Sequence, residues 1–133
     1  MSRVQFLLGV LGVASLAGCS GDSTNINQPS GLPPNGISIV VGAQNKGTAA
    51  FSPNPLTIAF ANGGVVKWFN DDGTAGSYGT TGTAHNITAD DGSFASGTLP
   101  PGQSFEATFT AAGTYHYHCS IHPAMKGTVI VTP

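Results

Sequence analysis

Charged residues are scarce in this sequence. Only 8% of the 133 residues carry a charge, the formal net charge is −2, and the single arginine, Arg3, lies near the N-terminus. A surface that binds nucleic acid needs clustered lysine and arginine, and the sequence has no such cluster. We therefore expect no DNA or RNA partner.

Helical stretches are lacking as well. No segment keeps a helical period of apolar residues over three turns, and no internal repeat is present. With 19 Gly and 9 Pro, the chain is instead rich in turn residues, and its length suits one domain. Short β-branched or alternating stretches lie between the turns, at 37–41, 56–60, 64–69, 84–89, 103–110, 114–119 and 127–132. This pattern predicts an all-β fold, a sandwich or barrel of about seven to eight strands.

The N-terminal segment reads as an export signal. After Arg3, an apolar run covers 4–14, which is too short to span a bilayer as a stable helix. It is followed by LAGC (16–19), which resembles the bacterial lipobox. The resemblance implies removal of a leader, 1–18, and attachment of a lipid to Cys19. The alternative is a plain secreted protein whose Cys19 is free or discarded.

Residues 19–36 are predicted to form a flexible tether. The stretch SGDSTNINQPSGLPPNG (20–36) has almost no apolar residues and many Gly, Ser, Pro and Asn. As a coil it would span roughly 20–25 Å root-mean-square. We thus expect a folded domain, 37–133, held by lipid on the extracytoplasmic side of a membrane, in the periplasm or at the cell surface.

Cysteine is rare, and one of the two cysteines lies among histidines. The chain has two Cys, and if Cys19 carries lipid then Cys119 is alone. It lies in TYHYHCSIHPAM (114–125), which holds three of the four histidines. Three interpretations are open: a metal site, half of a disulfide, or a histidine-rich surface strand.

Period-2 alternation divides this cluster. In a strand over 114–119, Tyr115, Tyr117 and Cys119 share one face. His116 and His118 share the other. Because tyrosine and cysteine suit the inward face, we expect both histidines to point outward, as a solvated strand face rather than a second metal site.

The remaining donors form a soft set. Cys119, His122 and Met125 follow one another at intervals of three residues, and His85 is the one other histidine. A thiolate, imidazoles and a weak thioether accommodate both oxidation states of copper. Zinc rarely uses a thioether, and structural zinc sites usually have at least two cysteines. Two alternatives remain: Cys119 as a buried core thiol, and Met125 as a core residue with another ligand in its place.

Several segments together resemble one family. GTYHYHCSIHPAMKGTVIV (113–131) resembles the C-terminal copper loop of the cupredoxins, the small blue copper proteins of plastocyanin and amicyanin type. FSPNPLTIAFANGGVVKWFN (51–70), AHNITADDGSF (84–94) and LPPGQSFEATFTAAGTYHYHC (99–119) look like that family's other strands. The likeness covers 37–133. It implies a Greek-key β-sandwich with one copper ion in a type 1 site.

The resemblance also implies residue roles. His85, Cys119 and His122 would be the trigonal copper ligands, with Met125 as the axial one. Asn86 would support the ligand loop through a hydrogen bond to Ser120.

An electron-transfer surface follows from the same resemblance. His122 would reach the surface through an apolar patch that includes Pro123 and Ala124, and His118 marks a second possible exit. One departure is the long, glycine-rich segment 71–83, which we expect near the copper end. The acidic pairs 71–72 and 90–91 are expected as turn residues, or else as a docking patch for a basic partner.

The function implied is one-electron transfer, in which the copper cycles between Cu(I) and Cu(II), without enzymatic activity. Its partners would be redox proteins such as c-type cytochromes or copper enzymes, met transiently by a monomer. A copper storage or delivery protein is the alternative. An enzyme of the multicopper or nitrite-reductase type would need further histidines for a catalytic copper.

Overall fold

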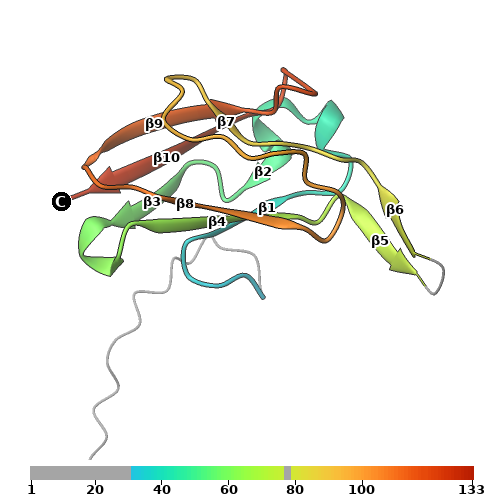
Figure 1. Ribbon diagram of the computed structural model, residues 1–133, viewed down its shortest axis with the longest axis horizontal. Coiled ribbons are helices and arrows are strands. Elements are labelled where there is room, and N and C mark those ends of the chain that lie inside the picture. The colour runs from blue at the N-terminus through green and yellow to red at the C-terminus, as the bar shows by residue number, and fades with distance from the viewer. Residues whose placement is uncertain (1–30, 77–78) are drawn as a thin grey trace, which may run out of the picture.

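Two four-stranded sheets make up the body of the protein. The computed structural model describes residues 31–76 and 79–133. The first sheet has the order β2-β1-β4-β8, with β1 (Gly36–Ile39), β2 (Phe51–Ser52), β4 (Val65–Asn70) and β8 (Ser104–Thr108). The second has the order β3-β10-β9-β7, with β3 (Leu56–Ala59), β7 (Thr88–Ala89), β9 (Gly113–His118) and β10 (Lys126–Thr132). Figure 1 shows the sheets stacked as two layers, which confirms the predicted β-sandwich.

The sheets are mixed. β1 runs parallel to β4, and β3 runs parallel to β10, whereas the other pairs are antiparallel. A separate hairpin, β5 (Gly73–Gly76) and β6 (Gly79–Gly82), extends away from the sandwich (Figure 1). Residues 31–76 and 79–133 also contain three short 3₁₀ helices: η1 (Ala43–Asn45), η2 (Gly47–Ala50) and η3 (Phe60–Asn62). Among the described residues, no helix is long and apolar enough to cross a membrane.

An aromatic cluster joins the two sheets. Trp68 on β4 and Tyr117 on β9 are both buried, and their rings meet edge to face with centroids 5.4 Å apart. Phe51 packs on the same tyrosine at 4.9 Å. Gly127 lies opposite Tyr117 in the β9–β10 ladder, and a Cβ atom at Gly127 would come within 2.2 Å of that ring. The glycine therefore lets the tyrosine lie flat across the neighbouring strand.

The alternation predicted for two strands is confirmed. In β8 and just beyond it, Ala107 and Phe109 are buried, whereas Glu106 is exposed. In β9, Tyr117 is buried and His116 is exposed. Side chains at alternate positions point to opposite faces, so one face of each strand lines the core.

Two segments differ from the strand prediction. Of the expected strand 84–89, only β7 belongs to a sheet; His85 instead forms an isolated bridge with Leu99. The segment 71–83, expected as a loop, forms the β5–β6 hairpin. Pairing with Leu99, 14 residues further along the chain, decided the first outcome, and pairing between two adjacent stretches decided the second.

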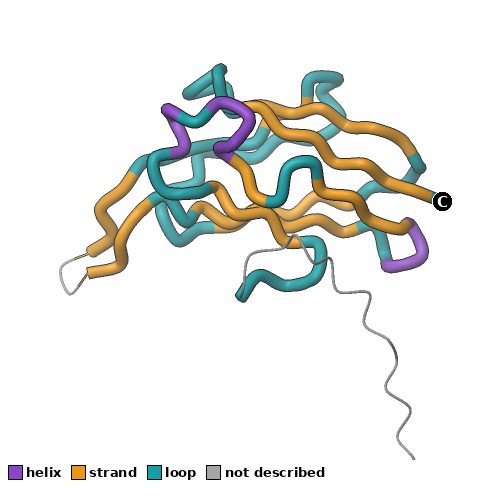
Figure 2. The backbone as a smooth tube through the Cα atoms, turned by 180° about the vertical axis from the view of Figure 1, so that it is seen from behind, coloured by secondary structure: helices purple, strands orange, loops and turns teal. Residues whose placement is uncertain are grey.

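The ends of the sandwich are unlike each other. Figures 1 and 2 show η1, η2 and the β5–β6 hairpin at one end, with η3 and the C-terminus at the other. The loop 119–125 belongs to the first end, where a Cβ on Gly47 would lie 3.8 Å from the Ala124 carbonyl. The predicted leader 1–18, Cys19 and the tether as far as residue 30 lie outside the described residues.

Candidate metal centre

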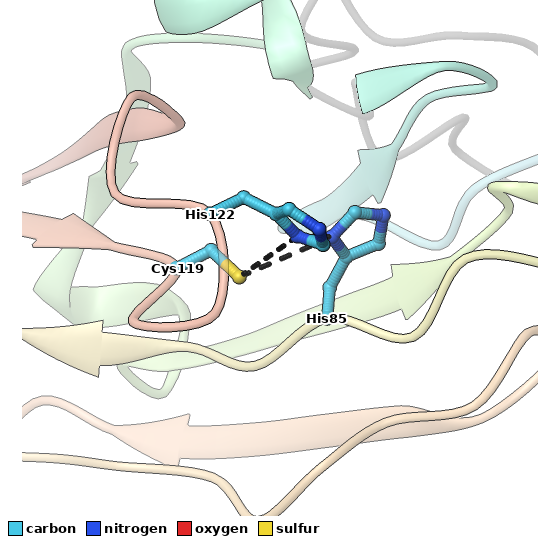
Figure 3. Close-up of side chains that lie close together, drawn as sticks. All are labelled: His85, Cys119 and His122. Carbon is cyan, nitrogen blue, oxygen red and sulfur yellow. Dashed lines mark hydrogen bonds between the residues drawn. The ribbon is translucent and has the colours of Figure 1, made fainter. Parts of the chain in front are cut away.

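Three potential metal ligands converge at this end from two segments far apart in the sequence. Cys119 directly follows β9, and His122 lies in the loop between β9 and β10. His85 comes from the stretch between β6 and β7, where its backbone N–H and C=O both pair with Leu99 at 3.1 and 2.7 Å. Figure 3 shows the two imidazole rings and the thiol pointing toward one another.

The distances among the donor atoms are short. Cys119 Sγ lies 3.9 Å from His85 Nδ1 and 3.9 Å from His122 Nδ1. The two Nδ1 atoms are 3.2 Å apart. Within the described part of the chain, this is the one group of three His, Cys, Asp or Glu residues able to share a metal ion. One ion could therefore contact all three side chains.

Met125 closes the ligand loop. Its N–H donates to the His122 carbonyl at 2.9 Å, and its own carbonyl accepts from the Cys119 N–H at 3.2 Å. The side chains of Met125 and Cys119 are both fully buried. The loop thus places a thioether and a thiol together inside the same end of the sandwich.

The surroundings of Cys119 favour the thiolate. Burial opposes ionisation of the thiol, but hydrogen bonds from His85, the Asn86 N–H and His122 outweigh it and lower the pKa of Cys119 to about 6. The Asn86 N–H lies 3.4 Å from Sγ. The thiolate is the form of cysteine that binds metals.

The sequence is similar to those of known copper-binding proteins. A family model described as copper binding proteins of the plastocyanin/azurin family matches residues 37–132. A plastocyanin from Scenedesmus fuscus is 32% identical over 108 residues, covering 71% of this chain and 98% of that protein. The chain belongs to the plastocyanin/azurin family of copper-binding proteins.

Two solved structures extend the comparison. A purple cupredoxin from Nitrosopumilus maritimus has 34% sequence identity and a TM-score of 0.59, covering 73% of this chain and 98% of that one. A copper-containing nitrite reductase from Thermus scotoductus has 28% identity and a TM-score of 0.56. The similarity covers 76% of this chain but 23% of the reductase. The predicted cupredoxin fold and the copper cofactor are confirmed, and family membership supports copper-based electron transfer.

The donor set fits copper. A thiolate, two imidazole nitrogens and a thioether suit Cu(I) and Cu(II). Cys119, His85 and His122 offer the first three in one group, and Met125 is the candidate for the fourth. His85 and Cys119 are 0% exposed, so their donor atoms are shielded from water. The Nε2 atom of His85 is already hydrogen-bonded elsewhere, which leaves Nδ1 free to face the thiol.

Asn86 and Ser120 tie the two ligand-bearing segments together. Asn86 Nδ2 donates to Ser120 Oγ at 2.6 Å, and the Ser120 N–H donates to Asn86 Oδ1 at 2.7 Å. Each residue directly follows a candidate ligand, His85 or Cys119. The pair of bonds therefore fixes the separation of the two ligands.

Asp72 is a part of the site that the sequence analysis missed. It was expected as a turn residue or as part of a docking patch for a basic partner, but it is only 4% exposed and its Oδ2 lies 2.8 Å from His85 Nε2. The signal was present in the period of β4: Val66, Trp68 and Asn70 are all buried at alternate positions, and Asp72 continues that series. Its place in the series would have predicted an inward side chain.

The surface near the site is apolar at one spot. His122 is half-buried, and Pro123 and Ala124 beside it are exposed, as is Ile121 at 45%.

The two histidines of β9 have partners other than the metal group. On the outer face of this strand, His118 Nδ1 lies 2.6 Å from Asp90 Oδ1. His116, on the same face, contacts Thr128 at 3.1 Å, so neither histidine joins the metal group.

Proposed function

We propose that this cupredoxin carries single electrons at a type 1 copper site formed by His85, Cys119, His122 and Met125. The observation that carries the proposal is the convergence of two imidazoles and a thiol within 3.9 Å inside one end of the sandwich. Bound copper supplies a one-electron couple, Cu(II)/Cu(I). The chain changes no bond in a substrate.

The protein's own part is to hold the donors still. His85 is anchored by its backbone bridge to Leu99, and Cys119 by its position at the end of a central strand. Close-packed interiors resist displacement, so the donors keep one arrangement in both oxidation states. Little rearrangement then accompanies each transfer.

His122 is the proposed route for electrons. Of His85, Cys119 and His122, only His122 is half-exposed. Its neighbours in the sequence, Ile121, Pro123 and Ala124, are exposed. A small apolar patch of this kind suits brief contact with another redox protein, such as a c-type cytochrome or a copper enzyme. His118 directly precedes Cys119 and offers a second exit.

We propose a carrier rather than an enzyme. The nitrite reductase it resembles is a far larger chain, of which this one matches 23%. A catalytic copper needs additional histidines, and among the described residues His116 and His118 lie outside any metal-sized group. Their partners are instead Thr128 and Asp90.

The proposed setting is the extracytoplasmic side of a membrane. The lipobox-like LAGC supports removal of 1–18 and lipid attachment at Cys19. Residues 19–36 would form the tether and 37–133 the cupredoxin domain, in keeping with a family match over 37–132. Two acyl chains make such attachment durable, and the domain would act as a monomer.

A copper titration of the purified, copper-free full chain tests the function. We expect one equivalent of Cu(II) to produce an intense visible thiolate-to-copper band and a narrow copper hyperfine splitting in the EPR spectrum. Cys119→Ala should abolish the band because the thiolate is lost. The matched control is His116→Ala, which removes a surface imidazole and should keep the band. A pale wild-type spectrum with wide splitting would contradict the proposal and favour copper storage or delivery.

A further inference from the structure

A carboxylate is buried directly behind one of the proposed ligands. Asp72 is 4% exposed, and its two oxygens accept three hydrogen bonds. Oδ1 accepts from the Gly42 N–H at 2.6 Å, and Oδ2 accepts from the Ala43 N–H at 3.2 Å. Oδ2 also lies 2.8 Å from His85 Nε2. Both oxygens are therefore occupied by donors.

The backbone around Asp72 is held independently of the ligand loop. Its N–H donates to Asn70 Oδ1 at 3.0 Å, and its carbonyl accepts from the Thr83 N–H at 2.9 Å. Asn70 Nδ2 in turn donates to the carbonyls of Thr83 and Leu99 at 2.9 and 2.7 Å. A Cβ on Gly82 would come within 2.1 Å of the Asp72 carbonyl, so the hairpin base approaches closely. These contacts hold the backbone of Asp72 in place without the contribution of its contact with His85.

The charge on Asp72 is stabilised where it lies. Burial disfavours the carboxylate, but the N–H groups of Gly42 and Ala43 and the imidazole of His85 all lie within hydrogen-bond distance of its oxygens and compensate for the lost water. Among the described residues, no lysine forms an ion pair with Asp72; the titratable side chain in contact with it is that of His85. The negative charge is thus directed at the imidazole.

We propose that Asp72 is a positioning residue for the copper site: it holds His85 with Nε2 protonated and Nδ1 turned toward Cys119, and its charge lowers the reduction potential of the bound copper. This inference rests on the proposed function, in which His85 is a ligand. Asp72 acts through His85 and does not itself contact the metal.

The physical reason lies in the difference of one charge between the oxidation states. A carboxylate that accepts the outer N–H of a ligating histidine raises the basicity of the inner nitrogen. A more basic nitrogen and a nearby negative charge both favour Cu(II) over Cu(I). Inside a protein this attraction is screened less than at the surface. Removing the charge should therefore shift the balance toward Cu(I).

Asp71 provides a matched control. It is adjacent in the sequence and carries the same charge, but its side chain is exposed and accepts from Ser38 Oγ at 2.5 Å. Asp71→Asn removes one charge near the same end of β4 without touching His85. Any effect of net charge alone should appear in this variant.

The test measures the midpoint potentials of three copper-loaded full-length proteins: wild type, Asp72→Asn and Asp71→Asn. We expect Asp72→Asn to keep the thiolate-to-copper band and to raise the potential. The ratio of the Cu(II) dissociation constant to the Cu(I) dissociation constant should increase about tenfold, which corresponds to a rise in potential of about 59 mV for one electron. Asp71→Asn should change it much less. Equal potentials in the two variants would overturn the inference.

A measurement on the wild type covers the case in which Asp72→Asn does not fold. In Cu(I)-loaded protein with ¹⁵N-labelled histidine, His85 Nε2 should carry a proton that exchanges slowly with water. An unprotonated Nε2, or exchange as fast as at exposed His116, would overturn the inference. Absence of the visible band in Cu(II)-loaded wild type would instead overturn the proposed function, and the inference with it.

Discussion

The double hydrogen bond between Asn86 and Ser120 should have a measurable effect on stability. Asn86→Ala removes both bonds, at 2.6 and 2.7 Å, whereas Ser120→Ala removes the side-chain bond and leaves the Ser120 N–H bound to Asn86 Oδ1. The two variants therefore differ by one hydrogen bond between the segments that carry His85 and Cys119.

The magnitude follows from what each bond contributes. A typical hydrogen bond contributes about 0.5–1.5 kcal/mol, and these two are partly open to water, which can replace the lost partners. We expect Ser120→Ala to lower the free energy of unfolding by about 0.5–1 kcal/mol and Asn86→Ala by about 1–2 kcal/mol. For a domain near 100 residues, 1 kcal/mol corresponds to a shift in Tm of about 4–8 °C.

Urea unfolding of the copper-free proteins, with the double variant included, measures these losses in the free energy of unfolding. The double variant should be no less stable than Asn86→Ala, because no bond between the two residues is left for the second change to remove. If Asn86→Ala destabilises the protein no more than Ser120→Ala, the bond from the Ser120 N–H does not stabilise the fold. The reasoning would then be refuted.

Two other predictions concern Met125 and Gly127. Met125→Leu should keep a coloured site but raise its potential, because the axial thioether that favours Cu(II) is lost; an unchanged midpoint in voltammetry would show that Met125 is not axial. Gly127→Ala should lower the free energy of unfolding by about 1–3 kcal/mol, because its Cβ would overlap the Tyr117 ring. Gly97→Ala, where a Cβ meets nothing within 4 Å, should change stability by less than about 0.5 kcal/mol when both glycine variants are compared by urea unfolding. Similar losses in both glycine variants would exclude the overlap as the cause.

Local patterns were sufficient to predict most of the strands and one side of the site. Alternation alone placed Tyr117 inside and His116 outside, because the side-chain period of a strand is two whatever its neighbours are. The spacing of Cys119, His122 and Met125 also lies within a single loop. These features depend on residues close together in the sequence, and the sequence displays them directly.

The arrival of His85 at this loop is a tertiary matter. No local rule says which segment will lie beside Cys119. His85 was predicted because it was the one histidine left and because the family resemblance implied it. In the structure, His85 is positioned by a bridge to Leu99 rather than by the strand expected at 84–89. Pairing between distant backbones was needed to place it.

Asp72 shows most clearly what the sequence determined and what it left open. Two adjacent aspartates look alike in the sequence, and the composition predicts turn residues for both. The sequence determined an all-β copper-binding domain because strand period and donor type are local properties. Only the tertiary structure decided that Asp71 faces solvent while Asp72 lies behind His85, because the N–H groups of Gly42 and Ala43 that stabilise its buried charge come from a different part of the chain.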